Sequence, residues 1–392
     1  WIVTRAAQAV GETAQPVALA QSPVWGLGRV IASEQPELAC TRIDLDAAHG
    51  PDEVDQLAEE IWFAGREDQV AFRGGERFVT RLRPAHHGAA GDLQVPRGQP
   101  YRLEIISRGQ LDQVELNAVP RMPPGPGQVE IQVRATGLNF RDVLNVMDLY
   151  PGDPGPLGGE CAGEVVAVGE GVEHVKPGDQ VMALAPASFA SYALTLAEFV
   201  MPKPAALSFE EAASIPIAFL SAYYALCRLG GMKAGERVLI HAASGGVGLA
   251  AIQLARQAGA EIFATAGSPR KREYLQALGI QHVMNSRSLD FAEQILQATG
   301  SEGVDLVLNS LTGETIASSL SVLRAGGRFL ELGKTDLWDQ ARVDAFRPGL
   351  TFHAIALDQM MAQQAALVRE LMQEVVPQFE DQRLQPLPLR KF

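Results

Sequence analysis

One short stretch of the sequence constrains the fold more than any other: a strand-like apolar run that leads through a glycine-rich turn into a helix-like segment. Val238-Leu239-Ile240 is the apolar run, and apolar residues recur at helical spacing from 249 to 254. Glycines between such elements let the backbone approach a pyrophosphate, and the helix N-terminus supplies amide donors and a favourable dipole. We therefore interpret the turn as a dinucleotide site rather than a mere connection. The residues expected to hold the dinucleotide are Ser244, Gly245, Gly246, Val247 and Gly248.

Strand-like and helix-like segments alternate on both sides of this turn. Such alternation is typical of a doubly wound, mostly parallel α/β sheet of the Rossmann type. We expect strands at 237–241, 261–265, 304–309 and 327–332, with helices at 247–258, 270–278 and 312–323. A further strand near 352–357 and a helix over about 359–378 follow.

The rest of the chain differs from this pattern. Residues 101–201 are strand-rich with Gly and Pro at close spacing, which predicts a compact β domain, and residues 84–100 have the composition of a linker. The first 83 residues hold short α/β pieces, including a hairpin at Gly74-Gly75, without a phosphate-binding turn. The chain opens at Trp1 and reads as part of a longer polypeptide. We place an N-terminal unit at 1–83, a linker at 84–100, a substrate domain at 101–215, a coenzyme domain at 216–347 and a return to the substrate domain at 348–392.

Composition excludes several classes of partner. The net charge of -13 argues against nucleic acid, because neutralising phosphates needs a basic surface. No run of about 18 apolar residues occurs, so no membrane span is expected. The three cysteines lie far apart, which gives neither a disulfide framework nor a metal-binding spacing and indicates a reducing, cytoplasmic setting.

The residues after the second strand of the coenzyme domain indicate which dinucleotide binds. NAD-binding units usually place an acid there to hold the ribose 2′-hydroxyl, but no acid stands near Ala266. A basic cluster follows instead, and we expect Ser268, Lys271 and Arg287 to hold a 2′-phosphate. The alternative is that the cluster is an ordinary solvated helix start. We predict NADPH as the coenzyme.

The part of the site where hydride is transferred needs groups that polarise the hydride acceptor and supply a proton. The seven histidines and three cysteines show no zinc-ligand spacing, so we expect no metal and look for side-chain acids. Tyr150 lies in a Gly/Pro-rich loop of the β domain, and Lys334 lies just after a predicted sheet strand, where ligands of open α/β sheets bind. Taken alone, a loop tyrosine or lysine is more often an ordinary surface side chain than a catalytic group.

Several strings resemble the enoylreductase domains of modular polyketide synthases and animal-type fatty acid synthases, within the medium-chain dehydrogenase/reductase superfamily. The resemblance covers about residues 101–391 and implies a GroES-like substrate domain plus a Rossmann domain. In zinc enzymes of this superfamily a Gly-His-Glu string carries a metal ligand, whereas this chain has Gly158-Gly159-Glu160. The matching strings are 137–143 (GLNFRDV), 157–163 (LGGECAG), 219–226 (FLSAYYAL), 241–248 (HAASGGVG), 285–291 (NSRSLDF) and 333–336 (GKTD).

The first 83 residues resemble the latter part of the noncatalytic, structural half of a polyketide ketoreductase. In that family the enoylreductase is inserted between the two ketoreductase halves, so the order of the segments matches. On this resemblance, Gly26-Leu27-Gly28 is interpreted as a turn of the truncated unit and not as a second coenzyme site. The same resemblance implies a further helix and a closing strand beyond residue 392.

The resemblance also implies a reaction. Hydride passes from NADPH to Cβ of an α,β-unsaturated acyl thioester carried by an acyl carrier protein, and Cα is then protonated. Tyr150 matches a proposed proton donor, Lys334 an alternative donor or enolate stabiliser, and Asp358 an acid that positions the lysine. Adjacent ketoreductase and dehydratase domains are the expected partners. We also expect Asn139, Asn309 and Gly333 beside the coenzyme.

Three alternatives stay open at this point. One is a free-standing zinc-free quinone or alkene reductase, against which the ketoreductase-like segment argues. Another is a relative diverted to a hydride-initiated ring closure. The third is a noncatalytic scaffold domain, which would be expected to lose the glycines of the turn or Lys334, and both are present.

Overall fold

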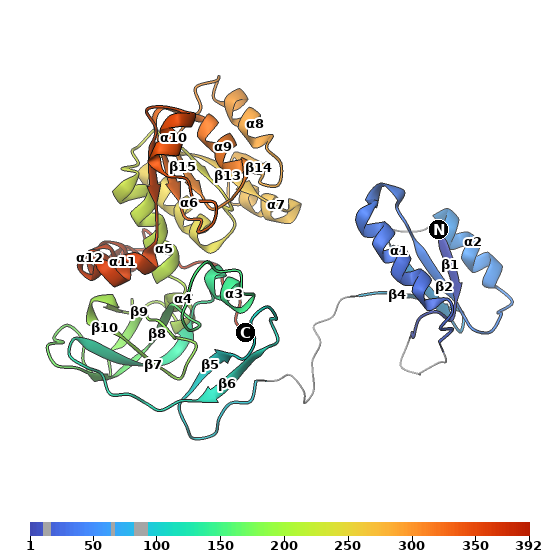
Figure 1. Ribbon diagram of the computed structural model, residues 1–392, viewed down its shortest axis with the longest axis horizontal. Coiled ribbons are helices and arrows are strands. Elements are labelled where there is room, and N and C mark those ends of the chain that lie inside the picture. Colours follow the sequence, from blue (N-terminus) through green and yellow to red (C-terminus); the bar gives the residue numbers. More distant parts are fainter. Residues whose placement is uncertain (11–16, 64–66, 82–92) are drawn as a thin grey trace. The chain divides into compact units, whose positions relative to one another are not determined.

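The computed structural model describes residues 1–10, 17–63, 67–81 and 93–392. The chain divides into two compact units, Trp1–Ala90 and Gly91–Phe392. The strands of each unit form sheets of their own (Figure 1). Each unit also has its own hydrophobic core.

The N-terminal unit is a four-stranded sheet in the order β1-β2-β3-β4, with two helices. The first three strands are parallel, and the tight turn at Gly74-Gly75 joins the last two as the predicted antiparallel hairpin. A small core that includes Ile43, Val70 and Phe72 packs against Leu57 of the second helix. The elements are β1 (Ile2–Arg5), α1 (Ser22–Glu34), β2 (Arg42–Leu45), α2 (Glu53–Phe63), β3 (Gln69–Arg73) and β4 (Glu76–Val79).

The interpretation of Gly26-Leu27-Gly28 as a turn is wrong, because these residues lie within helix α1. Gly28 is buried against β2, and a β-carbon added to it would lie 2.7 Å from Cδ of Arg42. The glycine therefore serves close packing of the helix on the sheet and not a change of chain direction.

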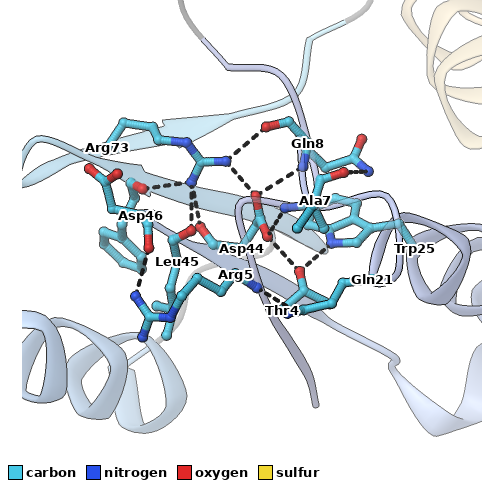
Figure 2. Close-up of polar contacts among 12 residues, drawn as sticks. Thr4, Arg5, Ala7, Gln8, Gln21, Trp25, Asp44, Leu45, Asp46 and Arg73 are labelled. Carbon is cyan, nitrogen blue, oxygen red and sulfur yellow. Dashed lines mark hydrogen bonds and ion pairs between the residues drawn. The ribbon is translucent and has the colours of Figure 1, made fainter. Parts of the chain in front are cut away.

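A buried polar network joins the carboxyl ends of the three parallel strands (Figure 2). The carboxylate of Asp44 accepts hydrogen bonds from the Thr4 hydroxyl (2.6 Å) and from the backbone amides of Ala7 (2.9 Å) and Gln8 (3.1 Å). The guanidinium of Arg73 pairs with the same carboxylate. The backbone amides that follow β1 are therefore already occupied by a carboxylate of the protein itself, that of Asp44.

The second unit begins with a β-rich region. Its five-stranded antiparallel sheet has the order β10-β7-β8-β9-β11, and a two-stranded ribbon, β5-β6, accompanies it. Apolar residues of the sheet form a core of their own, which includes Val129, Ile131 and Val181. The elements are β5 (Tyr101–Ile105), β6 (Val114–Ala118), β7 (Gln128–Thr136), α3 (Phe140–Val146), β8 (Glu160–Val168), β9 (Gln180–Leu184), β10 (Tyr192–Leu196) and β11 (Val200–Pro202).

The following region is the predicted parallel sheet with helices. Its six strands have the order β14-β13-β12-β15-β16-β17, so the chain reverses direction of winding beside β12. All pairs in this sheet are parallel. The elements are β12 (Arg237–Ile240), α6 (Gly246–Ala258), β13 (Glu261–Ala266), α7 (Pro269–Ala277), β14 (His282–Asn285), α8 (Phe291–Ala298), β15 (Val304–Asn309), α9 (Glu314–Ser321), β16 (Leu323–Glu331), α10 (Gln340–Phe346) and β17 (Thr351–Ala354).

The return from this sheet begins later than residue 348, where we expected it. Strand β17 pairs with β16, from Arg328↔Thr351 to Glu331↔Ala354, and so belongs to the six-stranded sheet. Apolar Phe352 stacks on Phe329 of β16, with ring centroids 5.7 Å apart. This packing holds the strand in the six-stranded sheet.

Helices join the five-stranded and the six-stranded sheet of the second unit (Figure 1). One continuous apolar core includes Met182 of β9, Phe219 of α5, Ile240 of β12 and Leu371 of α12. The fold thus confirms the predicted combination of a β-rich domain with a doubly wound domain. No described helix is both long and apolar enough to cross a membrane. The joining elements are α4 (Phe209–Ala213), α5 (Pro216–Tyr223), the π-helix η3 (Tyr224–Leu229), α11 (Leu357–Gln363), α12 (Ala365–Val375) and α13 (Pro377–Glu380).

Candidate active site

The glycine-rich turn lies where β12 passes into α6. Helix α6 begins at Gly246 with Gly245 as its N-cap, and its first intrahelical bond runs from the amide of Leu249 to the carbonyl of Gly245 (2.8 Å). The amides between these residues have no helical partner, as at every helix start. Gly245 and Gly246 are exposed. A β-carbon on Gly248 would lie 2.6 Å from Cα of Ala243, so glycine is required for the close approach of strand and helix. These features fit a pyrophosphate.

The end of β13 carries the basic cluster. Ala266 is buried, and Ser268 caps α7 by accepting a hydrogen bond from the amide of Lys271 (3.4 Å). Lys271 and Arg287 are exposed. A β-carbon on Gly267 would lie 3.1 Å from Nε of Arg287, so the structure brings this arginine from the β14–α8 connection to the loop that holds Ser268.

The sequence places Arg272 in this basic cluster, but it was not among the residues assigned to the 2′-phosphate. The guanidinium of Arg272 donates to the carbonyl of Ala266 (3.2 Å) and to Oδ1 of Asn285 (3.4 Å). It therefore reaches back over the carboxyl end of β13, whereas helical spacing alone would leave it among the exposed residues of α7. The positive charge of the cluster is arranged around the position after Ala266 where an NAD-binding unit would carry an acid.

A buried carboxylate holds the loops that follow β15 and β16. Glu331, 2% exposed, accepts hydrogen bonds from the side-chain amide of Asn309 (2.6 Å) and from the backbone amide of Gly333 (2.6 Å). Burial raises the pKa of Glu331, against the effect of these donors. Asn309 also donates to the carbonyl of Leu311 (2.8 Å). Both of its amide hydrogens are thus engaged inside the protein, so Asn309 shapes the loop after β15.

Tyr150, Lys334 and Asp358 come together from three distant parts of the chain. The Tyr150 hydroxyl donates to Oδ2 of Asp358 (3.1 Å), and Nζ of Lys334 donates to Oδ1 of the same carboxylate (2.8 Å). Tyr150 belongs to the loop after α3, Lys334 follows β16, and Asp358 lies in the first turn of α11. The site therefore unites the β-rich domain, the parallel sheet and the C-terminal helices.

The three groups affect each other's protonation. Burial alone would raise the pKa of Asp358, but the hydrogen bond and charge of Lys334, helped by Tyr150, lower it below the ordinary value. Burial raises the pKa of Tyr150, and the Asp358 charge raises it further, while Arg141 opposes both. The guanidinium of Arg141 lies 5.7 Å from the centre of the Tyr150 ring. At neutral pH the carboxylate is charged and the phenol retains its proton.

Asn139 lies at the start of α3 and is also tied to a buried carboxylate. Its side-chain amide donates to Oε1 of Glu160 (2.8 Å). Within the described residues no cluster of three or more His, Cys, Asp or Glu side chains is placed to hold a metal ion.

Comparison with known protein families gives three matches along the chain. Residues 1–82 match the Rossmann fold domain of the polyketide synthase extender module SpnB. Residues 125–205 match the alcohol dehydrogenase GroES-like domain, and residues 246–378 match a family described as zinc-binding dehydrogenase. The order of these matches follows the order of the three sheets.

Individual relatives extend the likeness over the whole chain. The chain is 41% identical over 410 residues to a phenolphthiocerol/phthiocerol polyketide synthase protein of Mycobacterium tuberculosis, covering 100% of this chain and 19% of that protein. The crystal structure of CurK enoyl reductase is 45% identical with a TM-score of 0.70, over 74% of this chain and 91% of that one. The chain belongs to the enoyl reductase domains of modular polyketide synthases. It spans about a fifth of the length of the curated relatives it matches.

Two further solved structures are informative about this enoyl reductase. The CurF ER cyclopropanase of the curacin A pathway is 38% identical with a TM-score of 0.71, over 74% of this chain and 91% of that one. Escherichia coli quinone oxidoreductase, solved in complex with NADPH, is 28% identical with a TM-score of 0.66, over 72% of this chain and 89% of that one.

Proposed function

We propose that residues 91–392 are an NADPH-dependent enoyl-thioester reductase. The observation that carries this proposal is the convergence of Tyr150 and Lys334 on Asp358, because two proton-carrying groups from different domains share one carboxylate. Both groups donate a hydrogen bond to the Asp358 carboxylate, so they lie close to each other at the edge of the parallel sheet. A reaction that ends by protonating a carbanion needs such a group.

The coenzyme is proposed to lie along the carboxyl end of the sheet, and when bound it supplies hydride to Cβ of the alkene. The amides at the start of α6 would hold its pyrophosphate, and Ser268, Lys271 and Arg287 its 2′-phosphate. Asn139 and Gly333 are proposed to lie beside its nicotinamide end. The accessible glycine backbone and the absence of an acid after Ala266 support this assignment.

The side chains of the triad are proposed to act on the electron pair left at Cα. Tyr150 donates its phenolic proton to Cα, while the charged Lys334 stabilises the enolate oxygen or serves as the alternative donor. Asp358 touches both and orients them, so its role is positioning. The raised pKa of Tyr150 keeps its proton available throughout the neutral range.

The substrate is proposed to be an α,β-unsaturated acyl chain on the phosphopantetheine arm of an acyl carrier protein. Two findings support this: the relatives are polyketide synthase proteins, and the SpnB-like segment precedes the reductase in the same chain. Adjacent ketoreductase and dehydratase domains would deliver that alkene.

A direct assay tests the proposal. The chain is incubated with NADPH and a crotonyl thioester of pantetheine, and loss of the reduced-nicotinamide absorbance is followed together with the mass of the acyl product. Turnover with a gain of two mass units is expected, with NADH at least about 10-fold less efficient, since a lost phosphate contact is worth more than about 1.4 kcal/mol. Intact NADPH binding without turnover would refute enoyl reduction.

The similarity to CurF ER cyclopropanase makes ring closure the second candidate. In that case the hydride adds to Cβ and the electron pair at Cα displaces a leaving group on the chain in place of taking a proton. The same mass measurement separates the two with a γ-chloro-crotonyl thioester. Loss of chloride without incorporation of a solvent proton at Cα would indicate ring closure.

A further inference from the structure

Glu160 is a buried carboxylate that the proposed reaction does not use. It is the first residue of β8 and is 2% exposed. Its Oε1 accepts from the side-chain amide of Asn139 (2.8 Å), and its Oε2 accepts from the backbone amide of Ile217 (2.7 Å). Both partners are uncharged donors, so nothing neutralises the carboxylate. A buried charge of this kind destabilises a fold, and an apolar residue would remove that cost.

The two partners of Glu160 lie on different parts of the unit. Asn139 immediately precedes α3 in the β-rich domain. Ile217 lies in the first turn of α5, which packs on α6, the helix that follows the glycine-rich turn. The positive end of the α5 dipole also favours a negative charge at this place. One carboxylate thus connects the residue before α3 to the helix layer that carries the glycine-rich turn.

The backbone between β7 and α3 packs closely against this carboxylate. A β-carbon on Gly137 would lie 2.3 Å from Oε1 of Glu160 and 2.6 Å from the carbonyl oxygen of Ala213. Glycine at 137 therefore leaves the space that the Glu160 carboxylate occupies.

We infer that Glu160 is a positioning residue that fixes Asn139 relative to the first turn of α5 and thereby sets how the nicotinamide end of the coenzyme is held. This inference rests on the proposed function, because Asn139 is assigned to the coenzyme there. Both donors need an acceptor at the same time. Only the ionised carboxylate offers two unprotonated oxygens, so its protonation removes one of the two links.

Protonation of Glu160 falls within the neutral range. Burial raises its pKa to about 7, the Ile217 amide and Asn139 oppose this, and the charge of Asp142 on α3 raises it further. The other elements packed on it add little: α5 and β9 carry no Asp, Glu, Lys, Arg or His. The charged residues of β7 and α4 are engaged elsewhere, namely Glu130 with Arg121, Arg134 with Glu164, Glu210 with Lys391, and Glu211 with the Ser208 amide.

The test compares Glu160→Gln with Glu164→Gln, the same change on the same strand at a partly exposed position paired with Arg134. NADPH binding is measured by nicotinamide fluorescence from pH 6 to 8.5. The rate of hydride transfer is measured with 4-deuterated NADPH, and the unfolding midpoint is recorded in parallel. In the unsubstituted chain we expect hydride transfer to weaken as pH falls through about 7. Glu164→Gln is expected to show the same loss of hydride transfer as the pH falls, which is called the pH step below.

Glu160→Gln is expected to lose the step and to slow hydride transfer about 10-fold or more, the equivalent of one hydrogen bond to a charged group. A Gln side chain offers one acceptor and one donor, so it cannot serve two donors. The double variant Asn139→Asp with Glu160→Gln exchanges donor and acceptor and is expected to recover the Ile217 link and the bond between the two side chains. It serves as the test should the single variant not fold.

The outcomes separate this inference from the proposed function. Hydride transfer in Glu160→Gln within twofold of the unsubstituted chain, or an unchanged pH step, would overturn the positioning role. So would a double variant that recovers neither folding nor NADPH binding relative to Glu160→Gln. If the unsubstituted chain binds NADPH but does not reduce the thioester, the proposed reaction fails, while the fluorescence titrations still decide the role of Glu160.

Discussion

Replacing Asp358 by Asn should reduce the activity far more than the stability. The carboxylate accepts hydrogen bonds from Lys334 and Tyr150, whereas an Asn side chain offers one acceptor and one donor. One of the two proton-carrying groups therefore loses its partner and its orientation. A positioned general acid contributes roughly 100- to 10,000-fold to a rate, and misplacement forfeits part of this, so kcat/KM should fall about 10- to 100-fold.

The stability change should be small because the pair is partly exposed. The side chains of Lys334 and Asp358 are 29% and 40% exposed, so solvent screens their attraction. Pairs of this kind are worth about 1 kcal/mol or less. The unfolding midpoint should therefore shift by no more than roughly 4 °C.

The pH profile gives a second, independent readout. Tyr150 can donate a proton only while it is protonated, so the rate is lost as pH rises through its pKa. Burial raises that pKa, and the charge of Asp358 raises it further. Removing the charge should bring the pKa of Tyr150 down, and the alkaline limb of kcat should move to lower pH.

The assay is NADPH oxidation with the crotonyl thioester, beside a control, Asp381→Asn. It is measured from pH 6 to about 11, because the ordinary pKa of tyrosine is about 10 and that of Tyr150 is raised. Asp381 also pairs with a cation, Arg383, and is 60% exposed at a distance along the chain from the triad. The control should behave as the unsubstituted chain. If Asp358→Asn kept more than half of kcat/KM and the alkaline limb did not move, the shared-carboxylate reasoning would be refuted.

Three further predictions concern the coenzyme site and the N-terminal unit. Arg287→Ala should raise KM for NADPH about 10-fold and leave KM for NADH unchanged, because only the 2′-phosphate would lose a partner; equal effects on both coenzymes would contradict the assignment. Gly248→Ala places a β-carbon 2.6 Å from Cα of Ala243, so α6 must shift; coenzyme affinity should fall and the unfolding free energy should drop by about 1–3 kcal/mol, and an unaltered titration and melt would count against the close approach. Asp44→Asn leaves the buried Arg73 without its counter-charge and should lower the unfolding free energy of the N-terminal unit by about 3 kcal/mol in denaturant titrations; a change below 1 kcal/mol would mean that the pair contributes little.

The sequence predicts the parallel sheet well because its strands are short buried runs separated by amphipathic helices. The predicted strand at 304–309 is β15 as observed, and the predicted helix at 247–258 differs from α6 by one residue. Helix α1 was missed because Gly26 and Gly28 look like chain breakers. The reason for Gly28 is tertiary: the side chain of Arg42 lies where its β-carbon would be, and no local pattern reveals that.

The candidate site was predictable only in part. The glycine turn and the basic cluster carry local signals, because both depend on residues that are close in sequence. Tyr150 and Asp358 are 208 positions apart. The family resemblance placed both in one site but paired Asp358 only with Lys334, so the hydrogen bond from Tyr150 to Asp358 was not predicted. Glu160 was noted only as part of the Gly158-Gly159-Glu160 triplet, and Glu331 was not noted at all, since the sequence does not distinguish a buried carboxylate from a solvated one. Only their exposure of 2% sets them apart.

Three carboxylates therefore organise the second unit, and each is placed where an element begins or ends. Glu160 opens β8, Glu331 closes β16, and Asp358 lies in the first turn of α11. Each accepts two hydrogen bonds, and in each case the donors come from different segments of the chain. A carboxylate has two equivalent acceptor oxygens, whereas an amide or hydroxyl cannot accept from two donors without also presenting a hydrogen. That difference is a physical reason for acids at these positions: the geometry of Asn139, Gly333 and Lys334 depends on acceptors that join two segments at once.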